Sequence, residues 1–200
     1  LIMALSVRAI FSSVQAIAAD RYEFDKSHTA ILFFVSHLGF SETVGKFTDF
    51  DGHFTFDKDK PQDSTVDVTL KPAGIKTSSD KLDAHLQNAD FFNVAKFPDI
   101  RFVSTGIKVT GEKTGDVMGS VTMLGMTKPV VMRVTFNKAD VFPMTQEFKA
   151  GFSAEATIKR SDFGMAYGLP AVGDDAKIRI ETEGVNVDMK KRMENKDAKY

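Results

Sequence analysis

The chain has 200 residues, a formal net charge of −1 and a mean hydropathy of −0.15, values typical of one soluble globular domain. A charge so close to zero argues against general DNA or RNA binding, because no basic field is present to hold a phosphate backbone. Zero cysteines exclude disulfides, thiolate nucleophiles, cysteine-ligated zinc and iron–sulfur clusters. The 18 Phe, set against 3 Tyr and no Trp, are expected to line a large core, an apolar cavity, or both.

Residues 1–19 are small and apolar, with one arginine, no acidic residue and no strand-like alternation. Ala16-Ile17-Ala18 matches a small-residue cleavage site, so we predict a secretory signal peptide over 1–19 and an exported protein. A short amphipathic helix that stays attached is the alternative. The stretch is too short and too interrupted for a membrane-spanning helix.

The next segments read as β-strands. Thr29–His37 alternates at period two and places four side chains on one face, namely Ile31, Phe33, Val35 and His37. The run Val44–Asp57 follows, and its phenylalanines at 50, 54 and 56 share one parity. Gly45 and Gly52 inside this run suggest bends or bulges that would curve a sheet towards a barrel.

The middle of the chain predicts one more strand and the clearest helix. Val66, Val68 and Leu70 alternate with polar residues, as in a strand with one wet face. Ser78–Asn88 predicts a helix, because a serine can cap it and Leu82 and Leu86 lie four residues apart on one face.

The second half of the chain consists of further short runs separated by glycine-rich turns. The predicted strands are Ile100–Ser104, Ile107–Val109, Val117–Leu124, Val130–Phe136, Ala150–Ile158 and Lys177–Thr182. Arg160–Asp175 is a glycine-rich loop, and Met189–Tyr200 is predicted as a frayed polar tail that could hold a helical turn. About eight short strands with one helix indicate an antiparallel barrel or sandwich, and residues 20–188 form one domain.

Five motifs in unbroken order, over roughly residues 22–185, resemble the YceI-like family of bacterial periplasmic polyisoprenoid-binding proteins. They are Ser27-His28-Thr29 with the strand to Gly39, Gly45-x-Phe47-x-x-Phe50-x-Gly52, Asp83-x-His85-Leu86 with Asp90-Phe91-Phe92 and Phe97-Pro98, Gly125-Met126-Thr127-Lys128-Pro129, and Gly151-Phe152-Ser153-Ala154 leading to Arg160-Ser161-Asp162-Phe163-Gly164. The chain has Leu82 where the family usually has an arginine, which puts a polar role for that position in doubt.

The resemblance implies an all-β, lipocalin-like, extended eight-stranded barrel with one or two short helices, exported to the periplasm. Members of the family hold a long isoprenoid or other amphiphilic chain in an internal tunnel, and isoprenoid quinones and polyprenyl compounds are the ligand class. The expected role is therefore binding, transport or storage of such a lipid, without catalysis and with no required cofactor beyond the bound lipid or quinone. Transient membrane contact and a homodimer are compatible with this role.

We expect the ligand-binding wall to consist of inward-facing apolar residues. The candidates are Ile31, Phe33, Val35, Phe50, Phe54, Val66, Val68, Phe91, Phe92, Phe97, Ile100, Phe102, Phe136, Phe152 and Phe163. The alternative is that the same residues form a filled core, since both interpretations need the same inward parity. Met118, Met123, Met126 and Met165 are flexible fillers that could adapt to a ligand.

His37 is the main polar candidate, because it shares a face with Phe33 and Val35 and could bond a ligand oxygen at the tunnel end. A buried histidine bonded to the backbone is the alternative. The four histidines have no metal-ligand spacing, and the chain has no nucleophile elbow, phosphate loop or HExxH motif. Two other functions stay open, namely an enzyme acting on such a lipid or on a small stress metabolite at the barrel mouth, and a structural β domain with a filled interior.

Overall fold

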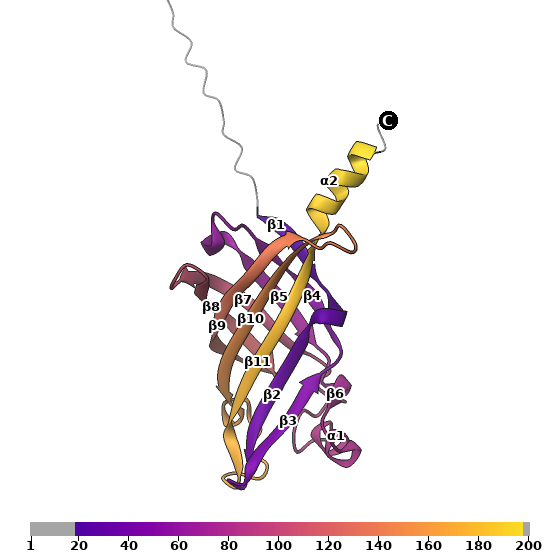
Figure 1. Cartoon of the computed structure of the whole chain (residues 1–200). Helices are drawn as coiled ribbons and strands as arrows, with labels where there is room; N and C mark the ends of the chain where they lie inside the picture. The colour runs from indigo at the N-terminus through magenta and orange to yellow at the C-terminus, as the bar shows by residue number, and fades with distance from the viewer. Residues whose placement is uncertain (1–18, 198–200) are drawn as a thin grey trace, which may run out of the picture.

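The computed structural model describes residues 19–197, and the predicted signal peptide lies outside them except for Ala19. Figure 1 shows a long barrel of strands with short helices at its ends. The strands are β1 Asp20–Phe24, β2 Ala30–His37, β3 Ser41–Phe47, β4 Phe50–Phe56, β5 Thr65–Leu70, β6 Ile75–Lys76, β7 Ile100–Val109, β8 Thr114–Met123, β9 Met126–Val141, β10 Phe148–Lys159 and β11 Val172–Asn186. The helices are η1 Lys26–His28, η2 Pro61–Asp63, η3 Pro72–Gly74, α1 Asp80–Leu86, η4 Arg160–Phe163 and α2 Val187–Asp197.

Eight antiparallel strands close into a barrel in the order β1-β4-β5-β7-β8-β9-β10-β11, with β11 pairing back onto β1. One edge of the long strand β11 pairs with two different strands along its length. Its end pairs with β1 at residues 184–186, and its first part pairs with β2 over residues 172–181. This confirms the predicted lipocalin-like eight-stranded barrel with short helices.

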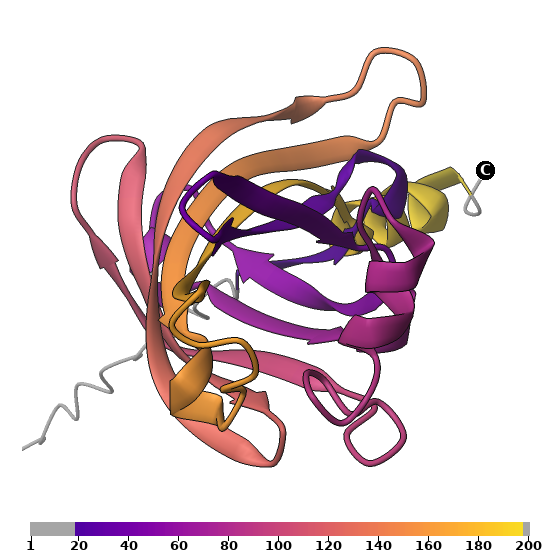
Figure 2. The ribbon, with the colours of Figure 1, turned by 90° about the horizontal axis from the view of Figure 1, so that it is seen from below.

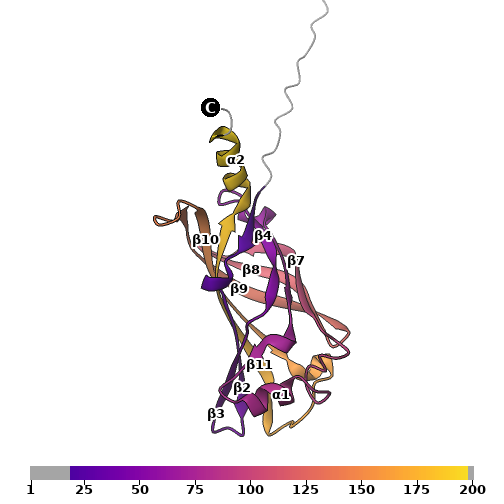
Figure 3. The ribbon, with the colours of Figure 1, turned by 90° about the vertical axis from the view of Figure 1, so that its right-hand side faces the viewer.

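The barrel widens where β2 replaces β1 along β11. The strands β2, β3 and β6 continue from that edge, and β6 ends the order. Figures 2 and 3 show β2, β3 and α1 at this end of the molecule, and Figure 1 shows α2 at the opposite end. The α1 helix and the segment 87–99 therefore belong to the half of the barrel in which β1 takes no part. None of the helices among the described residues is long and apolar enough to cross a membrane.

Three local predictions differ from the structure. The short β1 was not among the predicted strands, although Arg21-Tyr22-Glu23-Phe24 alternates polar and apolar residues and the structure buries Tyr22. The run Val44–Asp57 forms two strands, β3 and β4, separated at residues 48–49. Gly45 and Gly52 were expected to mark bends or bulges; the pairing register continues through both of them, so neither marks a bulge, and Gly52 has a positive φ of +145°. Gly45 instead admits a neighbouring ring, since a Cβ there would lie 2.2 Å from the Phe33 side chain.

The two helices at the ends have distinct supports. In α1 the Ser79 Oγ accepts a hydrogen bond from the Leu82 amide at 3.4 Å, as the capping pattern predicts. The predicted frayed tail instead forms α2, which begins at Val187. Arg192 holds it to the barrel through an ion pair with Asp20 at 3.0 Å.

An aromatic cluster fills the barrel at the β1 end, and we call it the aromatic plug. Its members are Tyr22, Phe24, Phe54, Phe56, Phe136 and Phe152. The rings of Tyr22 and Phe54 stack at 5.0 Å, and Phe152 meets Phe54 edge-on at 5.5 Å. Ring pairs at these separations and angles are favourable beyond the area that they bury. One half of the barrel therefore has a solid interior.

Shortening Phe54 to alanine should lower the free energy of unfolding by about 3–5 kcal/mol, because the plug cannot collapse around the missing ring. Urea unfolding followed by circular dichroism measures this loss. The matched control is Phe40→Ala, whose 89% exposed ring should change stability by less than about 0.5 kcal/mol. Equal small effects at both positions would show that the plug is not packed.

Candidate ligand-binding cavity

Beyond the aromatic plug the barrel is hollow. A cavity of about 450 Å³ lies among strands β2, β3, β5 and β7–β11, together with α1 and the segments that flank it and η4. This volume is within the range of small-molecule sites, which are typically concave and mostly apolar. The part of the chain that lines it is almost entirely aliphatic and aromatic.

Nine of the predicted ligand-binding residues line this cavity. They are Ile31, Phe33, Val35, His37, Val68, Phe91, Phe92, Ile100 and Phe102. They come from β2, β5, β7 and the segment after α1, where alternation or an apolar pair indicated an inward face. Their role in ligand binding stays a prediction.

Seven other predicted wall residues do not line the cavity, and they are Phe50, Phe54, Val66, Phe97, Phe136, Phe152 and Phe163. Phe54, Phe136 and Phe152 belong to the aromatic plug, and Val66 packs against it. Phe50 and Phe163 are buried in the hydrophobic cluster that also contains Phe33 and Phe47. Phe97 covers the turn at Gly125. Strand parity correctly placed Phe50, Phe54, Val66, Phe136 and Phe152 in the interior, but parity does not distinguish a filled section of a barrel from a hollow one.

Aliphatic residues on β8–β11 complete the wall, and the sequence analysis did not select them. The missed residues on these strands are Val121, Val130, Met132, Ala156, Ile158, Val172, Ala176, Ile178 and Ile180. The signal was present, because each set alternates at period two like the selected strands. Leu70, Thr43, Phe47, Leu82, His85, Leu86, Arg160 and Tyr167 also line the cavity. Of the four methionines considered as fillers, Met123 and Met165 line it, whereas Met118 and Met126 are exposed.

The cavity reaches solvent beside His37 and Tyr167, the two lining residues that are exposed. His37 ends β2 and pairs in register with Val172, the first residue of β11. Tyr167 lies in the loop between η4 and β11, and its ring meets the His85 ring of α1 edge-on at 5.0 Å. The mouth therefore lies where the β2 end, this loop and α1 come together.

His85 links α1 to the surrounding elements. Its Nε2 pairs with the Asp90 carboxylate at 2.9 Å, and its ring also meets Phe91 edge-on at 5.0 Å. Asp83, on the same helix, accepts from the Thr77 amide at 2.6 Å and from the Thr77 hydroxyl at 2.7 Å. The hydrogen bonds from Thr77 to Asp83 therefore hold the first turn of α1 in place. The contacts of His85 with Asp90, Phe91 and Tyr167 hold the face of α1 that is turned towards the mouth.

Arg160 is the cationic group of the cavity wall and is only 4% exposed. Its Nε donates to the Gly173 carbonyl at 2.8 Å, and Nη2 donates to the Val172 carbonyl at 3.2 Å. Further, longer bonds at 3.4 Å reach the Met165 and Tyr167 carbonyls. Burial lowers the pKa of its guanidinium, opposed by the Asp174 carboxylate, yet arginine remains charged in proteins.

The turn at residues 160–162 is braced by bonds to the start of β11 and to the loop before it. Arg160 binds backbone carbonyls, and Ser161 donates to Asp174 from its amide at 2.8 Å and from its hydroxyl at 2.7 Å. Arg160 thus ties η4 to the loop that carries Tyr167 and forms the mouth.

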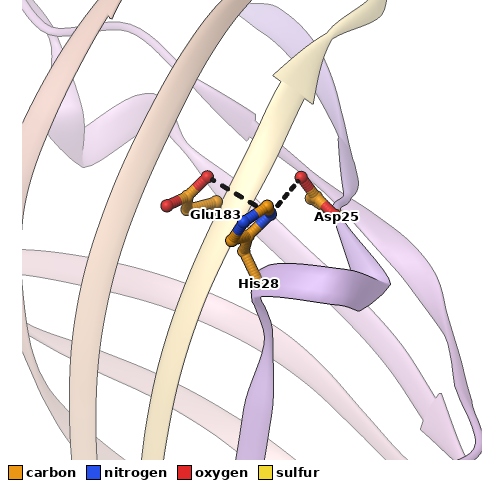
Figure 4. A group of neighbouring side chains, drawn as sticks. All are labelled: Asp25, His28 and Glu183. Atoms are coloured by element: carbon orange, nitrogen blue, oxygen red, sulfur yellow. Dashed lines mark hydrogen bonds and ion pairs between the residues drawn. The ribbon is translucent and has the colours of Figure 1, made fainter. Parts of the chain in front are cut away.

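A second polar cluster lies outside the cavity, between η1 and β11 (Figure 4). His28 Nδ1 is 2.9 Å from the Asp25 carboxylate and 3.9 Å from that of Glu183. These three side chains could together approach a metal ion. However, the Lys149 ammonium already pairs with Asp25 at 2.6 Å and with Glu183 at 3.3 Å, so both carboxylates have a cationic partner. The cluster is best described as an ion-pair network that joins η1, β10 and β11.

Burial alone would raise the pKa of Asp25, but hydrogen bonds from Lys149, Ser27 and His28 outweigh it and hold the pKa well below its usual range. Because the folded-state pKa is depressed, this carboxylate stabilises the fold above about pH 4 and loses that effect as the pH falls.

Asp25→Asn should therefore lower the free energy of unfolding by about 2 kcal/mol at pH 7, measured by urea unfolding. The difference from wild type should shrink below about pH 4, whereas the exposed Asp59→Asn control should show little effect at either pH. A pH-independent cost would contradict this assignment.

The fold and the site together define a lipocalin-like barrel with an apolar cavity that opens at one end. The model of the YceI-like domain matches residues 22–184, and the chain belongs to this family. UPF0312 proteins of Pseudomonas are similar over most of their length. One from Pseudomonas putida is 44% identical over 179 residues, which cover 88% of this chain and 92% of the relative. Another from Pseudomonas syringae pv. tomato is 45% identical with the same coverage.

Several solved structures have the same architecture. The Campylobacter jejuni YceI protein is 30% identical, has a TM-score of 0.69 and covers 75% of this chain and 88% of its own. Burkholderia cenocepacia BcnA, at 21% identity and a TM-score of 0.72, covers 80% of this chain and 98% of its own. A polyisoprenoid binding domain from Saccharophagus degradans, at 10% identity and a TM-score of 0.65, covers 82% and 98%. The last two matches establish the likeness of the fold alone.

Proposed function

We propose that this protein binds an isoprenoid lipid, such as a prenyl quinone or a polyprenyl compound, with its chain in the cavity and its polar end at the mouth. The observation that carries the proposal is the apolar cavity of about 450 Å³, whose lining includes the exposed residues His37 and Tyr167. The Saccharophagus degradans neighbour is described as a polyisoprenoid binding domain, which supports the same ligand class.

The size of the cavity limits how much of a prenyl chain it can enclose. At roughly 30 Å³ per non-hydrogen atom, the volume of a liquid water molecule, 450 Å³ holds about 15 atoms, or three isoprene units. Enclosing on the order of 400 Å² of prenyl surface at ~25 cal/mol per Å² contributes about 10 kcal/mol before the costs of association. A longer chain would leave its remaining units at the mouth.

The polar groups of the wall favour binding over catalysis. Arg160 is saturated by backbone carbonyls, and His85 is paired with Asp90. Ser104 and Asp83, which accept hydrogen bonds from Val66 and Thr77, do not line the cavity with His37. We therefore infer a carrier or storage role, and we place it in the periplasm on the strength of the predicted signal peptide.

A chain-length series tests the proposal. Titration of the protein with geraniol, farnesol and geranylgeraniol should show affinity rising steeply up to the three isoprene units of farnesol and little thereafter, because further units lie outside the enclosed volume. Isothermal calorimetry or displacement of a fluorescent fatty probe measures these affinities. No detectable binding of any prenol would contradict the proposed function.

A matched pair of variants on β10 locates the binding site. Ala156 faces the cavity, so Ala156→Phe should occupy part of the volume and weaken farnesol binding at least about tenfold. Thr157 is the next residue and is exposed, so Thr157→Phe should bind farnesol like the wild type. Equal affinities for the two variants would place the ligand elsewhere. Circular dichroism checks that both variants remain folded.

A further inference from the structure

The turn between β2 and β3 exposes two large apolar side chains beside the cavity mouth. Leu38 is 53% exposed and Phe40 is 89% exposed. They follow His37, which lines the cavity. Figure 1 shows this turn and the loop before β11 together at the lower tip of the molecule, the end away from α2.

A second turn in the same barrel shows that this exposure does not follow from the turn geometry. Leu38 and Gly39 have φ values of +54° and +75°, and Leu124 and Gly125, between β8 and β9, have +53° and +77°. Leu124 packs against the hydrophobic core, whereas Leu38 extends into solvent. A bulky residue in the left-handed region is uncommon, and at Leu38 core packing does not offset its cost.

The exposed turn is held firmly in place. The Leu38 amide donates to the Ala171 carbonyl at 2.9 Å, and the Phe40 amide donates to the His37 carbonyl at 3.0 Å. The first bond fixes the turn to the loop that carries Tyr167. The projecting side chains therefore have a fixed position relative to the mouth.

The two segments that meet here are almost free of charge. Residues 36–41 and 163–173, which we call the uncharged tip, carry no Asp, Glu, Lys or Arg, although such residues make up 26% of the chain. Tyr167, 49% exposed, adds an amphipathic ring of the kind enriched at membrane interfaces. The opposite end differs, because α2 presents Lys190, Lys191 and Arg192 in succession.

We propose that the uncharged tip docks on the surface of a lipid bilayer, inserting Leu38 and Phe40 so that a prenyl chain passes between the membrane and the cavity mouth. This inference rests on the proposed function. Two ion pairs flank the tip, Lys177 with Glu42 at 2.7 Å and Lys159 with Asp175 at 2.9 Å, and each is neutral as a pair, so neither calls for anionic lipid. A second copy of the chain is a poorer partner, since a stable interface buries roughly 1,200 Å² or more and two side chains on a turn supply far less.

The absence of tryptophan from the chain allows a direct test. Phe40→Trp places a single indole at the tip, and Met144→Trp places one in the loop between β9 and β10, where Met144 is 86% exposed. With phosphatidylcholine vesicles, the fluorescence of the Phe40→Trp variant should shift to the blue and be quenched by brominated phosphatidylcholine. The Met144→Trp variant should show neither change. Because both variants are full-length chains, vesicle attachment through residues 1–19 cannot imitate quenching confined to position 40.

Ligand transfer distinguishes this inference from the proposed function. Phe40→Ser should take up geranylgeraniol from ethanol as the wild type does, because Phe40 does not line the cavity. Its uptake from phosphatidylcholine vesicles should be slower by roughly fivefold or more, and Met144→Ser should be unaffected. An unquenched indole in Phe40→Trp, or equal uptake from vesicles by both serine variants, would overturn the docking proposal while leaving the function standing. Failure of wild-type uptake from ethanol would instead overturn the proposed function.

Discussion

The packing of Phe54 against Tyr22, Phe24 and Phe152 divides the interior of the barrel, and the rest of the structure depends on that division. An eight-stranded barrel is wide enough either to be filled by side chains or to hold one small ligand. This chain does both, in successive sections along the same strands. The aromatic plug secures the closed section where β1 joins β4 and β11, and none of its six residues lines the hollow section. The surplus of phenylalanine therefore serves stability at one end and an apolar wall at the other.

The hollow section exists because the sheet diverges there. Along β11 the short β1 gives way to β2, and β3 continues to β6 instead of to β4. The space so created is covered by α1 and the segment after it, whose Leu82, Leu86 and Phe91 face the cavity. Arg160 then shapes the mouth by binding carbonyls at the start of β11 and, at 3.4 Å, carbonyls of the loop before it. A buried cation is costly unless it is hydrogen-bonded, so the carbonyls that hold this loop also make the charge tolerable.

Much of this arrangement could be predicted from the sequence, and the limits have physical causes. Alternation in β2 and β7 identified Phe33 and Phe102 as inward-facing, and both line the cavity. The same parity identified Phe54 and Phe152, yet these fill the plug, because parity fixes the face of a strand and not what stands opposite. That distinction depends on the stagger of distant strands, such as β1 against β4 and β11, which alternation within a single strand does not report. Aliphatic residues such as Ala156 and Ile178 alternate just as regularly and also line the cavity, although they were not among the predicted wall residues.

The central claim is that the cavity holds a prenyl chain instead of remaining empty or being filled by the protein's own side chains. Mass spectrometry of an organic extract of the protein, purified from its native host without detergent, tests this most directly. The account predicts an isoprenoid lipid in near-stoichiometric amount, and its loss from the Ala156→Phe variant. An extract free of lipid, from protein that also fails to bind added prenols, would contradict the account and leave only the architecture.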